Sequence, residues 1–248
     1  MNNKYLTSFY ALVMTVALSG LLVPAVVDAD TAGATFTREA QAAITPARAL
    51  EMLEDGNERF VTGDSVKRDF LAQVRQTSKG QFPFAAVVSC LDSRIPPAIV
   101  FDQGIGDLFV ARVAGNFVND DILGSLEFAT RLSGARLIVV MGHTECGAIK
   151  GACDGAQLGL LTATLANINP AVEAVQAVQG DYTPRTSKNA GFVQAVTEMN
   201  VQLTMQVLYD RSVVLREMID KGEIGLVGAM YDVSSGKVTF TGKFVSGR

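Results

Sequence analysis

The sequence predicts an α/β fold: a mostly parallel central sheet with an antiparallel edge strand, helices on both faces and a helical arm at the N-terminus. Two observations support this prediction. Four short apolar runs rich in Val, Ile and Leu alternate along the chain with longer segments of helical periodicity. Apolar runs of this length are typical of strands buried on both faces of a parallel sheet. Their alternation with helices requires right-handed crossovers, which place helices on both faces.

The first predicted element is a helix from residue 45 to about 61, which forms the N-terminal arm. Thr45 supplies the N-cap, and Pro46 stands at the first helical position, where a proline costs no hydrogen bond. One face of this helix repeats apolar or small residues at helical spacing, so we expect it to pack against the sheet or a partner subunit. That face comprises Ala49, Leu53, Gly56 and Phe60.

Strands and helices then alternate to the end of the chain. The final run alternates apolar and polar residues after a Ser-Ser-Gly turn, so it is predicted to return by a hairpin as an antiparallel edge strand. The predicted parallel strands are 84–89, 107–112, 136–141 and 224–231, and the edge strand is 238–245. The predicted helices are 121–132 and about 190–221.

The N-terminus has the pattern of an export signal. Lys4 is the only charge before an apolar stretch at about 9–23, and small residues follow a helix-breaking proline. We expect residues 1–29 to be a signal peptide cleaved after Ala29, with Ala34 as a second candidate site. The alternative is a retained membrane anchor, but the stretch is short for a bilayer span.

The rest of the chain is predicted to be a linker at 30–44 and one domain at 45–248. After cleavage it is expected in the periplasm or secreted, without a stable membrane anchor. Apolar residues make up 48% of the 248 residues, enough for one sizeable core. Charged residues make up 19%, the net charge is -4, and no run of Lys or Arg could follow a phosphate backbone. Nucleic acid is therefore not an expected partner.

Cysteine and histidine are scarce in this chain. It has three cysteines and a single histidine, His143. An odd number of cysteines does not fit a disulfide framework in an exported protein. Cys90 directly follows the predicted strand 84–89, while His143 and Cys146 follow the strand 136–141. Because the carboxyl ends of parallel strands lie at one edge of a sheet, these three side chains are expected to converge.

Cys90, His143 and Cys146 form the three-ligand set of a catalytic zinc, with a fourth position left for water or another group. His143 and Cys146 are three residues apart and are predicted on the opening turn of a helix, whose free N–H groups favour the thiolate. For an isolated pair the alternative, a buried histidine and an inert thiol, would be preferred, but Cys90 at an equivalent strand end reverses that balance. Cys153 is expected to be a packed free thiol.

Two motifs resemble those of the β-carbonic anhydrases: Cys-x-Asp-Ser-Arg at 90–94 and His-x-x-Cys-Gly at 143–147. The resemblance runs from about residue 45 to 248, in the family's order and spacing. It implies a mostly parallel sheet with an N-terminal helical arm and one Zn²⁺ per subunit. It also implies a homodimer or a dimer of dimers, with active sites at the subunit interface. Similar family character appears at 106–110, 114–116 and 124–127.

The resemblance implies reversible hydration of carbon dioxide to bicarbonate and a proton, in which zinc-bound hydroxide attacks carbon dioxide. Two thiolates cancel the charge of the metal, so it acidifies water less than a three-histidine site would. Asp92 is expected either to bind zinc, which closes the site, or to accept a hydrogen bond that orients the hydroxide. Arg94 can hold the Asp92 carboxylate off the metal and open the site. The alternative is an ordinary ion pair at the end of a strand.

Two further residues are expected near the substrate. Gly147 follows the second thiolate, and its N–H could meet a bicarbonate oxygen; the alternative is a tightly packed glycine. Gln103 resembles in kind a family glutamine near the substrate, and the alternative is a plain loop glutamine.

Two other functions are compatible with these ligands. Relatives of the family hydrolyse carbonyl sulfide or carbon disulfide, and the ligand residues do not separate these substrates from carbon dioxide. The second alternative is a zinc-binding or thiol-redox protein without hydration activity. Against it, Asp92 and Arg94 are superfluous for storing zinc, and the chain has no Cys-x-x-Cys pair.

Overall fold

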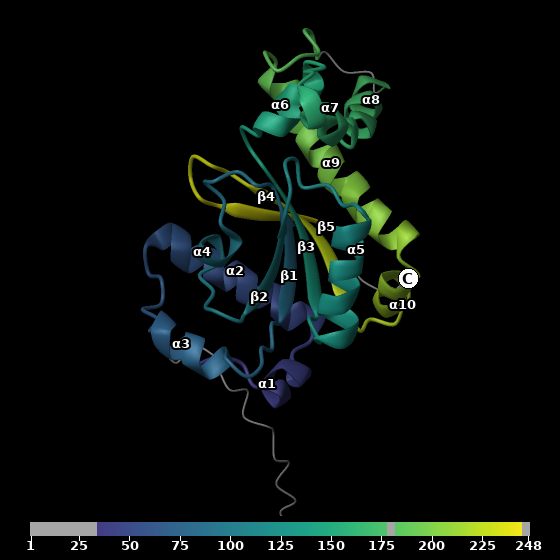
Figure 1. Cartoon of the computed structure of the whole chain (residues 1–248). Helices are drawn as coiled ribbons and strands as arrows, with labels where there is room; N and C mark the ends of the chain where they lie inside the picture. Colours follow the sequence, from purple (N-terminus) through teal and green to yellow (C-terminus); the bar gives the residue numbers. More distant parts are fainter. Residues whose placement is uncertain (1–33, 178–181, 245–248) are drawn as a thin grey trace, which may run out of the picture.

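The computed structural model describes residues 34–177 and 182–244 (Figure 1). The predicted signal peptide at 1–29 and the last residue of the predicted edge strand lie outside these ranges. Within the described part of the chain, no helix combines the length and the apolar character that crossing a bilayer requires.

The described residues form a five-stranded sheet in the order β2-β1-β3-β4-β5. The first four strands of this order run parallel, and β5 pairs antiparallel with β4. The predicted, mostly parallel sheet with an antiparallel edge strand is therefore confirmed. The strands are β1 (Ala85–Ser89), β2 (Leu108–Arg112), β3 (Leu137–His143), β4 (Gly225–Tyr231) and β5 (Val238–Phe244).

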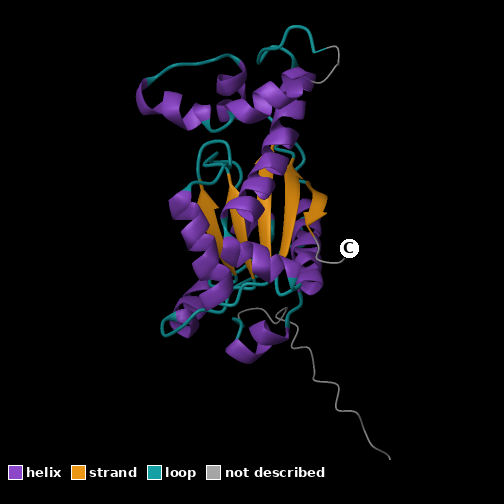
Figure 2. Ribbon diagram, turned by 90° about the vertical axis from the view of Figure 1, so that its right-hand side faces the viewer, coloured by secondary structure: helices purple, strands orange, loops and turns teal. Residues whose placement is uncertain are grey.

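The helices along the described chain are α1 (Arg38–Ala43), α2 (Pro46–Thr62), α3 (Phe70–Thr77), α4 (Pro97–Val100), α5 (Asp120–Glu127), the π-helical turn η1 (Phe128–Leu132), α6 (Gly147–Cys153), α7 (Gly159–Ala166), α8 (Asn169–Ala177), α9 (Ala190–Arg211) and α10 (Val213–Asp220). They cover both faces of the sheet, as predicted (Figure 2). On one face, Val87 and Val139 belong to a core with α2, α6, α8 and the first half of α9. On the other face, Val88 and Val140 belong to a core with α5, α10 and the second half of α9.

Helix α2 is the predicted N-terminal arm, and it packs on the sheet of its own chain. The Thr45 hydroxyl accepts a hydrogen bond from the Arg48 N–H at 3.1 Å, which confirms the predicted N-cap. Ala49 and Leu53 are fully buried in the core that contains β1 and β3. At position 56 a Cβ atom would lie 1.9 Å from the Phe101 carbonyl oxygen, so α2 approaches the turn after α4 this closely only with a glycine there.

Three predicted boundaries and the predicted burial of one strand differ from the structure. Helix α1 lies within the predicted linker, with Thr37 as its N-cap. The helix predicted at 121–132 changes from α5 to η1 after Glu127. The helix predicted at 190–221 is broken at Ser212, which ends α9 and caps α10 by accepting from the Leu215 N–H. β2 was predicted to be buried on both faces, but it is half exposed because it lies at the edge of the sheet.

Candidate active site

Three side chains converge at the carboxyl edge of the sheet, as the sequence predicts. Cys90 directly follows β1, His143 is the last residue of β3, and Cys146 is the N-cap of α6. Their ligand atoms all lie within 4.8 Å of one another, and all three residues are buried. We refer to these three residues as the Cys-His-Cys cluster.

The geometry of the cluster fits a tetrahedral zinc. Two sulfurs bound to one tetrahedral zinc at about 2.3 Å lie about 3.8 Å apart, and the Cys90 and Cys146 sulfurs are 3.9 Å apart. The His143 Nδ1 lies 2.9 Å from the Thr144 carbonyl oxygen, which can only accept, so Nδ1 carries the proton. Nε2 is then left with its lone pair, and it is buried without a hydrogen-bond partner among the described residues. A metal ion would satisfy this atom.

The two thiols of the cluster are coupled to each other. The pKa of Cys90 is lowered to about 4, mainly because the Cys146 thiol donates a hydrogen bond to its sulfur, helped by the Gly115 N–H. The pKa of Cys146 is raised because it holds that shared proton and because it is buried. A doubly charged cation between the two sulfurs would favour the loss of the second proton.

The local backbone around the second cysteine corrects one prediction. His143 and Cys146 do not share the opening turn of a helix, because His143 still belongs to β3 and Cys146 precedes α6 in extended conformation. The chain reverses between them through Glu145, whose φ of 58° is left-handed. The predicted effect of the helix N-terminus does occur, since the N–H groups of Ala148 and Ile149 lower the pKa of Cys146, although burial and Cys90 outweigh them.

Asp92 and Arg94 form a bidentate ion pair. Arg94 donates from Nε at 3.0 Å and from Nη2 at 2.8 Å to the two carboxylate oxygens of Asp92, and its backbone N–H adds a third bond at 2.9 Å. These contacts hold the pKa of Asp92 well below its usual range. Arg94 also donates from Nη2 to the Glu145 carbonyl at 3.4 Å, which places the pair beside the turn between His143 and Cys146. In this arrangement Asp92 binds Arg94 and is not a member of the Cys-His-Cys cluster.

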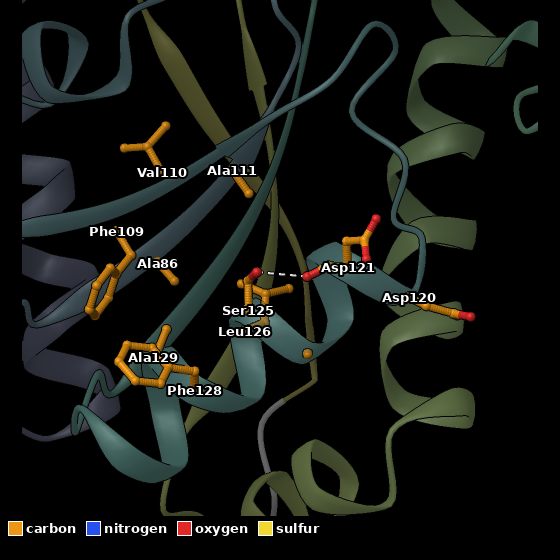
Figure 3. Close-up of a pocket in the computed structure, with 11 residues that line it drawn as sticks. Ala86, Phe109, Val110, Ala111, Asp120, Asp121, Ser125, Leu126, Phe128 and Ala129 are labelled. Carbon is orange, nitrogen blue, oxygen red and sulfur yellow. Dashed lines mark hydrogen bonds between the residues drawn. The ribbon is translucent and has the colours of Figure 1, made fainter.

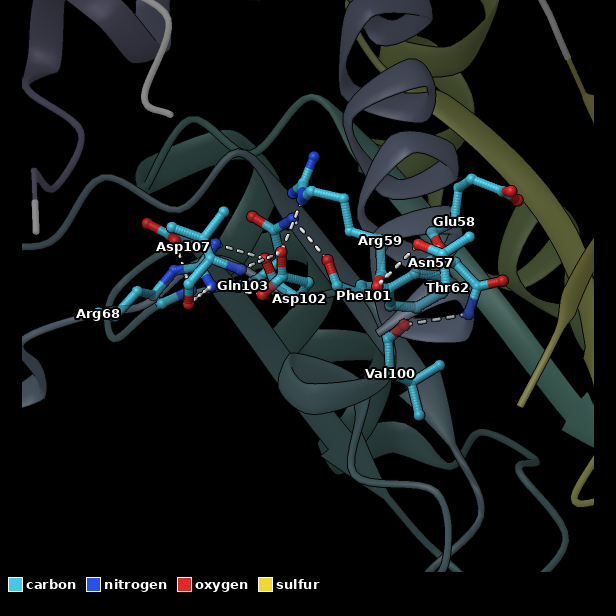
Figure 4. A network of polar contacts seen from close by, with 12 residues as sticks. Asn57, Glu58, Arg59, Thr62, Arg68, Val100, Phe101, Asp102, Gln103 and Asp107 are labelled. Atoms are coloured by element: carbon cyan, nitrogen blue, oxygen red, sulfur yellow. Dashed lines mark hydrogen bonds and ion pairs between the residues drawn. The ribbon is translucent and has the colours of Figure 1, made fainter. Parts of the chain in front are cut away.

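Gln103 lies on a loop held by a network of charges (Figure 4). Its side-chain amide donates to the Phe101 carbonyl at 2.7 Å. None of its described hydrogen bonds joins the Cys-His-Cys cluster. The preceding residue, Asp102, has a left-handed φ of 45° and accepts from Arg59 at 2.6 Å and from Arg68 at 2.5 Å. Gln103 is therefore fixed beside α2 by its neighbours on the loop.

The remaining two residues singled out in the sequence have clear surroundings. Gly147 is exposed at the start of α6, and a Cβ atom added there would meet nothing within 4 Å. Tight packing therefore does not explain this glycine. Cys153 is a buried member of the core, and burial raises the pKa of its thiol to about 11, so the predicted packed free thiol is confirmed.

Sequence reasoning missed three residues that support the site. Arg112, at the end of β2, donates to the carbonyl oxygens of both Cys90 and Asp92. Gly115 donates its N–H to the Cys90 sulfur, and its own carbonyl accepts from the Asn200 side chain. Arg112 could have been found, because a charged residue at the carboxyl end of a parallel strand faces the ligand edge. Asn200 gave no such signal, since it lies within a long helix.

The Cys-His-Cys cluster could hold a metal ion at the carboxyl edge of the sheet, which is the edge where α/β enzymes bind their ligands. The sequence profile described as carbonic anhydrase matches residues 85–238. Carbonic anhydrase 2 of Mycobacterium tuberculosis is 33% identical over 196 residues, which are 77% of this chain and 91% of that protein. The carbonic anhydrase of Mycolicibacterium smegmatis is 33% identical over 198 residues, with 78% and 92% covered.

Solved structures agree with these sequence matches. The β-carbonic anhydrase CafA of Aspergillus fumigatus superposes with a TM-score of 0.59 at 25% identity, covering 79% of this chain and 89% of that one. The Coccomyxa β-carbonic anhydrase, solved in complex with acetazolamide, has the same fold, with a TM-score of 0.62 at 21% identity, covering 79% and 86%. The chain belongs to the β-carbonic anhydrase family. It is thus an enzyme of a family whose reaction is the hydration of carbon dioxide.

Proposed function

We propose that this protein hydrates carbon dioxide reversibly to bicarbonate and a proton, using one zinc ion held by Cys90, His143 and Cys146. The observation that carries the proposal is the convergence of two sulfurs 3.9 Å apart with a buried, unpartnered imidazole nitrogen. A donor set of two thiolates and one imidazole favours zinc over the harder cations magnesium and calcium. Family membership supports the choice of reaction.

The mechanism assigns separate tasks to the residues around the cluster. Cys90, His143 and Cys146 would hold the zinc, which would supply a water molecule acidic enough to act as the nucleophile near neutral pH. An Asp92 carboxylate oxygen accepts a hydrogen bond from the attacking oxygen and so directs a lone pair of that oxygen to the carbon of carbon dioxide. Arg94 holds both Asp92 oxygens and keeps the carboxylate from taking the fourth position itself.

Two further contacts to substrate are proposed. The N–H of Gly147 is one of the free donors at the start of α6, and the exposed space beside it admits a bicarbonate oxygen. Gln103 is proposed to contact the substrate from the loop at 102–107. The contacts that Arg59 and Arg68 make with the carboxylate and the carbonyl of Asp102 support this role because they hold the loop in place.

Zinc content measured together with stopped-flow hydration of carbon dioxide tests the proposal. Wild type is expected to hold one zinc per chain, whereas Cys90→Ser, His143→Ala and Cys146→Ser each lose zinc and activity. Cys153→Ser is the matched control, since its thiol is buried outside the cluster, and it keeps both. Zinc without hydration would indicate a storage protein, and faster turnover of carbonyl sulfide or carbon disulfide would indicate the other hydrolase. Either result would overturn the proposed reaction.

We propose in addition that the protein assembles as a homodimer, or a dimer of dimers, through the open edge of β2. This edge adjoins an apolar pocket of about 510 Å³, where Phe109 and Phe128 pack edge to face (Figure 3). Val110 and Phe128 are 42% and 51% exposed, and an exposed apolar strand edge favours pairing with a second copy about a two-fold axis. A Sordaria macrospora β-carbonic anhydrase of similar fold is described as tetrameric.

Light scattering after size-exclusion chromatography tests this interface. Val110→Lys is expected to shift the protein towards the monomer. Val213→Lys, which charges a valine on α10 that is 55% exposed, is expected to leave the assembly unchanged. A dimer that survives Val110→Lys would exclude this edge as the interface.

We further propose that residues 1–29 direct export to the periplasm or the exterior, with 30–44 and 45–248 remaining as the mature protein. The apolar stretch and the small residues before Ala29 support this proposal. Cell fractionation with N-terminal sequencing of the product tests it. A cytosolic, uncleaved chain would refute it.

A further inference from the structure

The turn that follows β1 carries both a proposed metal ligand and the proposed gating carboxylate, and one arginine binds its backbone twice. Arg112 donates from Nε to the Cys90 carbonyl at 2.9 Å and from Nη2 to the Asp92 carbonyl. The two carbonyls belong to residues two positions apart, so the planar guanidinium bridges the turn as a rigid fork. Arg112 can do this because β2 ends in register with β1, where Ser89 pairs with Arg112.

The chain that follows Arg112 returns to the same cysteine from another side. The Gly115 N–H points at the Cys90 sulfur at 3.4 Å, and the Gly115 carbonyl accepts from the Asn200 side chain at 2.8 Å. Gly115 has a φ of 85°, and a Cβ atom there would lie 2.5 Å from the Ile168 side chain, so only glycine fits. Asn200 is buried on α9 and anchors this contact.

We infer that Arg112 is a positioning residue for the zinc site, and that Asn200 is its counterpart on the other side of Cys90. Arg112 touches neither the cluster sulfurs nor the side chain of Asp92 in any described hydrogen bond. It acts on the backbone, and so it couples the direction of the Cys90 sulfur to the placement of Asp92. The inference rests on the proposed function, because it assumes that the cluster binds zinc.

The physical reason is the cost of leaving the turn loose. With Arg112 removed, the Cys90 carbonyl loses its described donor and the Asp92 carbonyl keeps only the Ile95 N–H at 3.2 Å. The turn between Cys90 and Asp92 then gains alternative conformations, of which few direct the sulfur at the cluster. Zinc must then order the turn when it binds. Groups that orient metal ligands typically contribute about 10- to 100-fold to metal affinity, and this is the loss expected for Arg112→Ala.

The test measures zinc affinity on the folded, full-length protein by competition with a chromophoric chelator. Arg112→Ala is expected to weaken zinc binding about 10- to 100-fold. Arg112→Lys should recover part of that loss, since one ammonium can reach one carbonyl but lacks the two-pronged fork. Arg216→Ala is the matched control, because Arg216 also donates to two backbone carbonyls, those of Tyr209 and Asp210, but lies on α10. It should keep wild-type affinity.

A second readout separates positioning from general stability. In the cobalt-substituted protein, Arg112→Ala is expected to shift the thiolate-to-cobalt absorption, because the Cys90 sulfur changes its angle at the metal. Asn200→Leu provides the corresponding test on the other side of Cys90, because it removes the donor to the Gly115 carbonyl. Asn200→Asp removes the same donor without changing the size of the side chain. Unchanged zinc affinity in Arg112→Ala would overturn the inference, as would an equal loss in Arg216→Ala. If the wild-type protein binds no zinc, the proposed function fails instead, so the two failures are distinguishable.

Discussion

Replacing Asp102 by Asn would measure how strongly the buried charge network holds the loop that carries Gln103. The Asp102 side chain is 4% exposed and pairs with Arg59, which is 25% exposed, and with Arg68, which is 11% exposed. Asparagine has nearly the same size and tolerates the left-handed backbone that Asp102 adopts. The substitution therefore removes the charge while keeping the shape, and it leaves two partly buried guanidinium groups facing an amide.

The expected loss is large because the Asp102 carboxylate is buried and its two partners are only partly exposed. Breaking a buried ion pair by neutralising one member costs about 3–5 kcal/mol, since the other charge stays in a poorly hydrated place. For a domain of this size, each kcal/mol lowers the melting temperature by about 2–4 °C, so Asp102→Asn is expected to melt about 6–20 °C below wild type. Urea unfolding at pH 7, followed by circular dichroism, gives the free energy of unfolding directly.

The dependence on pH provides an internal check. Burial would raise the pKa of Asp102, but the hydrogen bonds from Arg59, Arg68 and the Val66 N–H outweigh it and lower the pKa below its ordinary value. Because the folded pKa is the lower one, the stabilisation is complete above about pH 4 and is lost as the pH falls through the folded value. The difference between wild type and Asp102→Asn should therefore be constant from pH 8 to 5 and shrink below about pH 4.

An exposed ion pair on α10 supplies the control. Glu217 lies 3.6 Å from Lys221 with both side chains more than half exposed, so Glu217→Gln should cost less than about 0.5 kcal/mol. If Asp102→Asn were no more costly than Glu217→Gln, burial would not be what makes the Asp102 network strong.

Three other predictions concern the active site. Gly147→Pro removes one N–H at the first position of α6, where a helix accepts proline and where the preceding Cys146 is extended. It should lower kcat/KM for bicarbonate dehydration about tenfold or more, whereas Gly147→Ala keeps the N–H and should lower it less. Equal losses in the two variants would show that the N–H is not used. Arg94→Ala should keep zinc but lose activity, because the freed Asp92 carboxylate turns to the metal. X-ray absorption would detect this carboxylate as an added oxygen ligand. An unchanged coordination sphere would refute the proposal that Arg94 keeps Asp92 off the metal. His143 is the only histidine and is fully buried, so no other histidine can carry the proton away from the site and buffer molecules must do so. The kcat should therefore rise with imidazole buffer near neutral pH, while kcat/KM for carbon dioxide stays constant. A kcat already saturated at low buffer concentration would reveal an internal proton relay.

The sequence by itself determined the fold class and the residues of the Cys-His-Cys cluster. Short apolar runs are typical of strands in a parallel sheet, and the carboxyl ends of parallel strands lie along one edge, so Cys90 and His143 were expected at the same edge of the sheet. Local rules were sufficient for Thr45 as well, because a helix N-cap depends only on the residues next to it. Cys153 could be set aside on the same kind of local argument.

The tertiary structure decided everything that depends on contacts between distant segments. β2 became an open edge because no strand pairs on its outer side, and its apolar run alone resembled a buried strand. Only the folded chain brings Arg112 to Cys90 and Asn200 to Gly115, 22 and 85 residues apart in sequence. Only the folded chain ties Asp102 to Arg59 and Arg68 and so holds Gln103 beside α2. The physical reason is that hydrogen bonds and ion pairs are directional and short, and no local pattern records which distant donor will lie within 3 Å.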